Sequence, residues 1–176
     1  MRYFLLLLLC FLLQLQYLSA DKGEKIVITA ESCIGVKESG NNRGVQVQKF
    51  QQSVNASIGS PWCAAFIRYV LDKAGAGLIR VRSALAQDYI VKSSVKAKDV
   101  AKGYIKVKPG WLVIWKYADT YRGHIGIVKN WDKNEGNTVE GNTGADGGRE
   151  GDGVYGKHRK IISYAQLHIT HFTPTY

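Results

Sequence analysis

Residues 60–71 read Ser-Pro-Trp-Cys-Ala-Ala-Phe-Ile-Arg-Tyr-Val-Leu, and this stretch decides the fold class. Ser60 is a typical helix cap, and Pro61 suits the first helical position because its missing N–H is not needed there. The residues that follow are apolar on almost every side of a helix, which predicts a buried central helix. Gly75 and Gly77 predict its end. We therefore expect the domain to be built around this helix.

The chain changes in character near residue 105, and the patterns before that point are helical. Two further helices are predicted before that point, over residues 25–36 and 45–54. After residue 110, short β-branched and aromatic runs are divided by Gly, Asn and Asp, which predicts strands over residues 111–117, 124–131, 137–142, 155–164 and 168–172. Helices followed by strands predict an α+β domain, with an antiparallel sheet against the buried helix.

The N-terminal residues 1–20 have the pattern of a secretory signal peptide. Arg2 precedes an apolar run of about ten residues, and a small residue, Ala20, stands at the junction with a polar segment. The run is shorter than the roughly twenty residues of a membrane span, so an uncleaved anchor is the less favoured alternative. We expect cleavage near Ala20, export to the periplasm or out of the cell, and no stable membrane insertion afterwards.

Residues 21–176 are then expected to form a single monomeric domain, a length that can bury its own core. The chain carries a net charge of +10, which suits an anionic partner such as a cell wall, nucleic acid or membrane. Its basic residues are scattered, and clusters such as residues 92–102 and 157–160 are typical of solvated faces. Because no basic stripe with interleaved aromatics is present, nucleic acid is not expected as a partner.

Two cysteines remain after the signal peptide, and Cys63 has a physical reason to be reactive. It lies in the first turn of the predicted central helix, where unpaired amides and the helix dipole stabilise a thiolate. A small buried apolar side chain is the competing interpretation. A disulfide with Cys33, which we expect on the apolar side of the helix over residues 25–36, is a further alternative in an oxidising compartment.

His124 begins a predicted strand and lies between Gly123 and Gly126, which leave space for a close neighbour. Strand alternation puts His124, Gly126 and Val128 on one face. An imidazole followed on its own face by glycine is better suited to meet a helix end or a substrate than to pack in a core. A hydrogen-bonded core histidine is the alternative.

Glu140 and Asn142 supply a third element, since residues two apart on a strand point to the same face. A carboxylate beside His124 would fix its tautomer and stabilise the imidazolium, and an amide could orient the ring or bind substrate. Nucleophile, base and orienting group together follow the logic of covalent catalysis. A turn after a strand explains Glu140 and Asn142 nearly as well.

Three motifs in this order resemble those of CHAP domains, the cysteine- and histidine-dependent amidohydrolase and peptidase relatives of the NlpC/P60 enzymes. They are Gly59–Phe66, Gly123–Val128 and Val139–Thr143. Upstream, residues 35–44 are similar to an N-terminal signature of one subset of these proteins. The resemblance extends from about Lys25 to Arg159, which is nearly all of the chain after the signal peptide.

The resemblance implies a papain-like fold and hydrolysis of amide bonds in bacterial peptidoglycan, as an N-acetylmuramoyl-L-alanine amidase or an endopeptidase. It implies that Cys63 attacks to form a thioester acyl-enzyme while His124 takes and returns the proton. Glu140 would orient His124, and Asn142 would support the polar site or the oxyanion. A cysteine that precedes the histidine argues against the permuted lipid-acyltransferase relatives. A catalytically silent wall-binding domain of the same fold is the alternative.

Three further residues are candidate contacts for substrate: Trp62, Glu38 and Asn42. Glu38 and Asn42 could line the cleft, although a structured loop that caps a helix explains them nearly as well. Trp62 could stack on a sugar ring, with core packing as the alternative. Some relatives bind calcium through acidic residues just before the cysteine, but residues 51–62 contain no Asp or Glu. We therefore expect no metal and no cofactor, and peptidoglycan as the partner.

Overall fold

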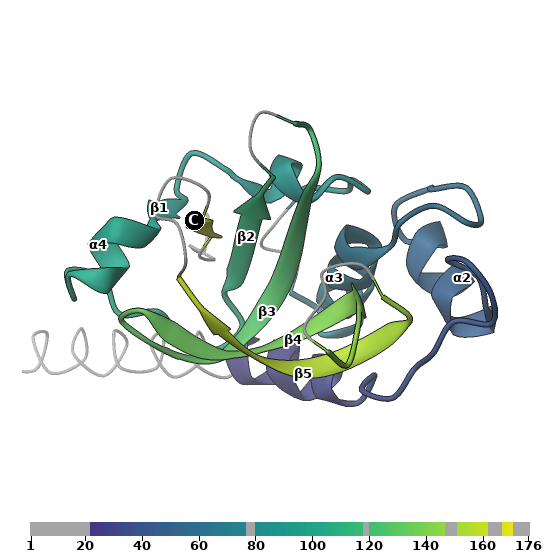
Figure 1. Ribbon diagram of the computed structural model, residues 1–176, viewed down its shortest axis with the longest axis horizontal. Coiled ribbons are helices and arrows are strands. Elements are labelled where there is room, and N and C mark those ends of the chain that lie inside the picture. Colours follow the sequence, from purple (N-terminus) through teal and green to yellow (C-terminus); the bar gives the residue numbers. More distant parts are fainter. Residues whose placement is uncertain (1–21, 77–79, 118–119, 147–150, 162–166, 171–176) are drawn as a thin grey trace, which may run out of the picture.

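The computed structural model of the chain describes residues 22–76, 80–117, 120–146, 151–161 and 167–170 (Figure 1). The expected signal peptide lies outside these residues. So do Gly77, His171 and parts of the two strands expected over residues 155–164 and 168–172. None of the helices in the described ranges combines the length and the apolar character that crossing a membrane requires.

The described strands form one antiparallel sheet, in the order β1-β6-β2-β3-β4-β5 (Figure 1). The strands are β1 (Val95–Lys96), β2 (Leu112–Lys116), β3 (Gly123–Asp132), β4 (Glu135–Thr143), β5 (Gly153–Lys160) and β6 (Leu167–Thr170). Strands β2 to β5 pair in chain order, and β6 returns to pair with β2. The predicted antiparallel sheet is therefore confirmed.

Helices pack against this sheet, which confirms the α+β class and is consistent with a papain-like fold. They are α2 (Val45–Gln52), α3 (Cys63–Lys73), the 3-10 helix η1 (Ala86–Tyr89), α4 (Ala97–Ala101) and a helix over residues 22–31. Helix α3 contacts both β3 and β4. Figure 1 shows α2 and α3 at one end of the molecule and α4 at the other.

Buried apolar side chains lie on both faces of the sheet. On β2, Leu112 and Ile114 belong to a large cluster that includes the helices, while Val113 and Trp115 belong to a smaller one. This alternation is the strand periodicity expected when both faces are covered. Helix α3 is buried along most of its length, which confirms the prediction of a buried central helix.

The predicted start of the central helix is wrong by two residues. Ser60 does not cap it and Pro61 does not open it, because α3 begins at Cys63 with Trp62 at the N-cap position and no side-chain cap. The Trp62 indole is fully buried and stacks on Phe50 at 5.5 Å between ring centroids. Its burial orients the chain just before the helix, so Cys63 becomes the first helical residue.

The helix predicted over residues 25–36 ends early, at residue 31. The residues that follow pair with the start of β5 instead. The Gly35 N–H donates to the Val154 carbonyl at 3.1 Å, and the Glu38 N–H donates to the Asp152 carbonyl at 2.7 Å. Cys33 therefore lies in a turn and not on the helix. The same pairing places the loop that carries Glu38 beside the start of β5.

The uniformly helical character predicted before residue 105 is also wrong. Between α3 and β2 the chain forms η1, the two-residue strand β1 and the short helix α4. Strand β1 pairs with β6 at the edge of the sheet. Elements this short have too few residues to show a hydrophobic period, so pairing with distant strands decides their conformation.

A tight contact between β4 and α3 leads to a stability prediction. A Cβ at Gly141 would lie 2.7 Å from the Phe66 Cβ and 2.8 Å from the Trp62 ring. Both neighbours are fully buried and have no room to move. Gly141→Ala should therefore lower the free energy of unfolding by about 1–3 kcal/mol, measured by urea denaturation.

The matched control is Gly156→Ala on β5, where the nearest atom to the added carbon is the Ile34 Cδ1 at 3.9 Å. This exposed position should change the free energy of unfolding by no more than about 0.5 kcal/mol. Equal effects of the two substitutions would contradict the close packing of Gly141.

Candidate active site

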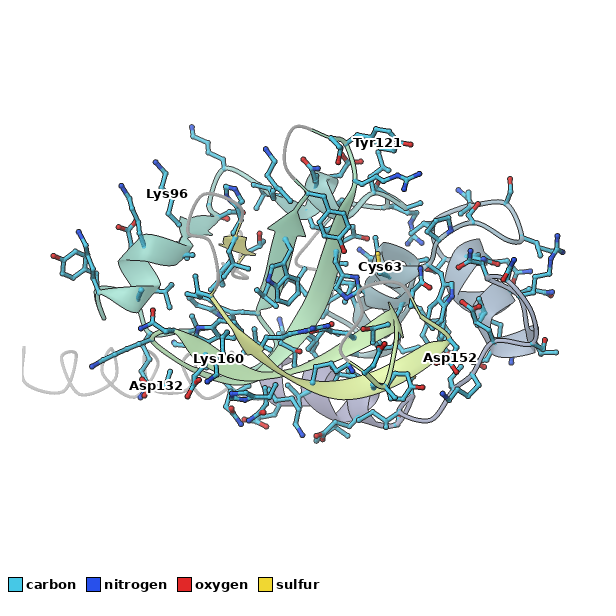
Figure 2. All side chains as sticks on the ribbon, viewed as in Figure 1. Cys63, Lys96, Tyr121, Asp132, Asp152 and Lys160 are labelled. Atoms are coloured by element: carbon cyan, nitrogen blue, oxygen red, sulfur yellow. The ribbon has the colours of Figure 1, made fainter. Side chains whose placement is uncertain are left out.

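Cys63, labelled in Figure 2, is the first residue of helix α3. It lines a cleft of about 740 Å³. Its side chain is 8 % exposed, so the thiol is mostly covered yet reachable from the cleft. Both Cys63 and Cys33 are free thiols, and no disulfide joins them. The N–H groups at a helix start have no intrahelical acceptor and favour negative charge. The fold thus places the Cys63 thiol at a helix start beside the cleft.

His124 lies on β3 and is fully buried. Its Nε2 is 2.9 Å from the Glu140 Oε2. Its Nδ1 is buried and is the ring nitrogen that Glu140 leaves for the Cys63 thiol. Burial alone would lower the pKa of His124, but hydrogen bonding with Cys63 and Glu140 and the charge of Glu140 raise it to about 9.

Glu140 on β4 is a fully buried carboxylate. Besides His124, its donors are the Thr138 Oγ1 at 2.6 Å, the Arg159 Nε at 2.8 Å and the Arg159 Nη2 at 2.5 Å. Burial alone would raise the pKa of Glu140, but hydrogen bonds from Arg159 and His124 and their charges lower it to about 2. Glu140 is therefore ionised at neutral pH.

Gly126 makes room for the Glu140 side chain, as expected from the sequence, in which the glycines beside His124 leave space for a close neighbour. A Cβ at Gly126 would lie 2.8 Å from the Glu140 Cγ, which no real side chain tolerates. With pKa values of about 9 for His124 and about 2 for Glu140, the two form an imidazolium–carboxylate pair at neutral pH.

Arg159 on β5 is the residue of this site that sequence reasoning missed. It belongs to the cluster over residues 157–160 expected on a solvated face, yet its side chain is only 15 % exposed. Its guanidinium lies over the Trp115 ring at 5.6 Å, and the Trp115 ring lies 5.8 Å from that of His124. The period of two along β5 separates Arg159 from Lys160, but only the pairing of β5 with β4 identifies its partner.

Asn142 lies at the end of β4, 5 % exposed, and lines the cleft. With its amide oriented to satisfy both neighbours, Nδ2 donates to the Gly151 carbonyl at 2.9 Å and Oδ1 accepts from the Trp62 N–H at 3.3 Å. A β-bulge between Glu140 and Thr143 and a φ of +54° at Asn142 break the alternation on which its predicted placement relied. Asn142 thus contacts the backbone that leads into Cys63.

The three candidate substrate contacts divide into two groups. Glu38 and Asn42 line the cleft, and the Glu38 Oε2 accepts a hydrogen bond from the Asn42 N–H at 2.9 Å. The Trp62 indole is fully buried, so it has no exposed ring surface to offer a sugar. Its Nε1 donates instead to the Glu38 Oε1 at 2.6 Å, which fixes one wall of the cleft.

No three His, Cys, Asp or Glu side chains gather closely enough to hold a metal ion in the described part of the chain. The arrangement around Cys63 instead provides what covalent catalysis needs: a nucleophile at a helix start, a ring that exchanges protons, and a fixed anion behind the ring.

The raised pKa of His124 depends on Glu140 and can be tested directly. In Glu140→Gln the neutral amide removes the charge while burial still disfavours the imidazolium, so the pKa of His124 should fall from about 9 to its ordinary value of 6.5 or below. NMR titration of the His124 ring measures it. Glu135→Gln, which removes an exposed carboxylate, should leave it unchanged. A His124 pKa still near 9 without Glu140 would refute the assignment.

Comparison with known proteins adds the family. A family model described as the CHAP domain matches residues 55–142, half of the chain. Cys63, His124, Glu140 and Asn142 lie inside the matched range, whereas Glu38 and Arg159 lie outside it. Neither the search of curated proteins nor that of solved structures gave a match. The chain belongs to the CHAP domain family, whose members are generally cysteine- and histidine-dependent amidohydrolases or peptidases.

Proposed function

We propose that the chain is an exported cysteine amidohydrolase or peptidase that cuts amide bonds of bacterial peptidoglycan, with Cys63 as nucleophile and His124 as base. The observation that carries the proposal is the imidazole of His124, backed by ionised Glu140 and next to the Cys63 thiol at an open cleft. Membership in the CHAP family supports the reaction class. The N-terminal residues 1–20 and the net charge of +10 support export and an anionic target.

The first half of the reaction makes a thioester. The Nδ1 of His124 first takes the thiol proton, and the Cys63 Sγ then attacks the carbonyl carbon of the scissile amide. The carbon–nitrogen bond of the tetrahedral intermediate then breaks. His124 gives the proton to the departing nitrogen, so the amine leaves neutral and the acyl group stays on sulfur.

The second half hydrolyses the thioester with the same base. His124 takes a proton from water, the resulting hydroxide attacks the thioester carbonyl, and the carbon–sulfur bond breaks. The proton returns from His124 to the Cys63 sulfur, and the acyl portion leaves as a carboxylic acid. Glu140 stays ionised throughout, because its role is to stabilise the imidazolium and fix the ring.

The negative oxygen of each intermediate needs donors near Cys63. The Cys63 N–H suits this role because it is the first N–H of α3 and has no intrahelical acceptor. Asn142 supports this donor indirectly, since its side-chain oxygen accepts a hydrogen bond from the N–H of the preceding residue, Trp62. In this mechanism Asn142 positions the helix start, and the backbone at Cys63 contacts the oxyanion.

Digestion of purified peptidoglycan tests the proposal. The protein without residues 1–20 should release soluble fragments, and Cys63→Ala should release none, because no other group in the mechanism forms the acyl-enzyme. Cys33→Ala is the matched control and should keep its activity. Mass spectrometry of the fragments identifies the bond. If several wall types yield no fragments, the hydrolase proposal fails, and binding of the protein to the same walls would then favour the silent wall-binding alternative.

Arg159 should matter as a positioning residue, since it acts only through Glu140. Arg159→Gln should lower kcat by about tenfold or more with little change in KM, because the carboxylate behind His124 loses its bidentate support. Arg159→Lys keeps the charge without the planar fork and should recover part of the rate. Lys160→Gln, at the exposed neighbouring position, should have no effect.

A merely structural role for Arg159 predicts a different pattern. Loss of stability would lower the amount of folded enzyme and leave the pH dependence of kcat unchanged. Loosening of Glu140 should shift the pH profile, because Glu140 helps to set the pKa of His124. A pH profile identical to that of the wild-type enzyme would therefore contradict the positioning role.

A further inference from the structure

The cleft above Cys63 has two walls with different charges. The first wall includes Glu38, Asn42 and Asp152, held together by the hydrogen bond from the Glu38 N–H to the Asp152 carbonyl at 2.7 Å. The second includes Tyr121 and Arg122, from the connection between β2 and β3. In Figure 2, Cys63 lies between Tyr121 on one side and Asp152 on the other.

On the first wall, Glu38 carries the charge that matters. The Asp152 carboxylate is neutralised by Lys37 at 2.7 Å and also accepts a hydrogen bond from Tyr155 at 2.7 Å. The Glu38 carboxylate accepts from the Trp62 indole and from a backbone N–H, both of which are neutral donors. No cation pairs with Glu38 in the described part of the chain, so this wall presents a net negative charge.

On the second wall, Arg122 presents the opposite charge. It is the sole Lys or Arg among the described residues that line the cleft, and its side chain is exposed. Its carbonyl accepts from the Tyr117 N–H at 3.1 Å and from the Gln87 Nε2 at 2.7 Å, and its N–H donates to the Thr120 Oγ1 at 3.1 Å. The backbone is thus fixed while the guanidinium has no carboxylate partner within the described residues.

Two other arginines show how a guanidinium is fixed by a carboxylate of this protein. Arg159 is bonded to Glu140 and Arg68 to Asp72, and both are covered from solvent. Arg122 is held through its backbone and lines the cleft. A planar guanidinium in such a place matches a carboxylate through two parallel hydrogen bonds.

The position of His124 decides which end of a substrate meets Arg122. Arg122 stands two residues before His124, at the entry to β3, and His124 gives its proton to the departing nitrogen. The amine side of the scissile bond therefore lies toward the second wall, and the acyl side toward Glu38. A carboxylate on the acyl side would be repelled by Glu38, whereas one on the amine side would be attracted by Arg122.

We infer that Arg122 is a specificity-determining residue that binds a carboxylate on the amine-side portion of the substrate, and that Glu38 and Arg122 together set the direction in which an acidic peptide enters the cleft. This inference rests on the proposed function and adds to it the chemical class of the substrate. The substrate is a peptide with a free carboxylate beyond the scissile nitrogen.

Paired synthetic muropeptides test the inference, once wall digestion has identified the bond that is cut. Each pair has the same sequence and carries either a free carboxylate or a carboxamide on the amine-side portion. Wild-type enzyme should prefer the carboxylate form by about fivefold or more in kcat/KM. The preference should shrink as salt concentration rises, because the charge pair is solvent-exposed.

Arg122→Gln should abolish this preference, so that the two forms are hydrolysed with equal kcat/KM, and Arg122→Lys should retain part of it. Lys102→Gln, which removes one positive charge at the end of α4, should leave the preference intact. An equal preference in wild type and Arg122→Gln would overturn the inference. Loss of all hydrolysis in wild type would instead overturn the proposed function, so the two failures are distinguishable.

Discussion

The carboxylate of Glu140 has no contact with water and must obtain all its stabilisation from the protein. A buried charge without partners costs several kcal/mol, so its donors are a requirement of the fold and not an accessory. Thr138, Arg159 and His124 supply them from three different strands. The pairing of β3, β4 and β5 therefore has to be correct before this charge is tolerated. Once it is, the same bonds hold the imidazole at the Cys63 thiol.

Close approach of backbone and side chains makes this arrangement possible. Gly126 leaves the space that the Glu140 side chain occupies, and Gly141 lets β4 lie against Phe66 of the central helix. The first glycine acts on the His124 side of the sheet and the second on the helix side. Together they explain why the motifs around His124 and Glu140 contain glycine at positions where a strand would ordinarily prefer a larger residue.

The sequence is sufficient for those parts of the site whose chemistry is local. Cys63 near a helix start, His124 beside glycines and Glu140 on a following strand are visible from short-range patterns, as are the sheet and the buried helix. The placement of Arg159 is not, because alternation along the strand separates it from Lys160 but only the register of β5 on β4 shows which of the two meets Glu140. The bulge that turns Asn142 toward Trp62 is likewise a result of packing at the helix start.

The errors in the predicted helices have a related cause. Residues 32–36 have a helical pattern, but their backbone pairs with the start of β5, and this pairing puts Glu38 on the cleft wall. Ser60 and Pro61 have the pattern of a helix start, but burial of the Trp62 indole moves the start to Cys63. In both places, long-range packing overrides local propensity at a position that shapes the cleft.

Arg159 and Arg122 show how one residue type serves two purposes on the same sheet. The guanidinium of Arg159 is mostly buried, lies over the Trp115 ring and is bonded to the Glu140 carboxylate. Its charge therefore serves to hold Glu140 in place. Arg122 has an anchored backbone and an exposed side chain and lines the open cleft, where its charge is available to a ligand. Burial and the bonding partner, and not the residue type, distinguish the arginine that supports the catalytic groups from the arginine that selects the substrate.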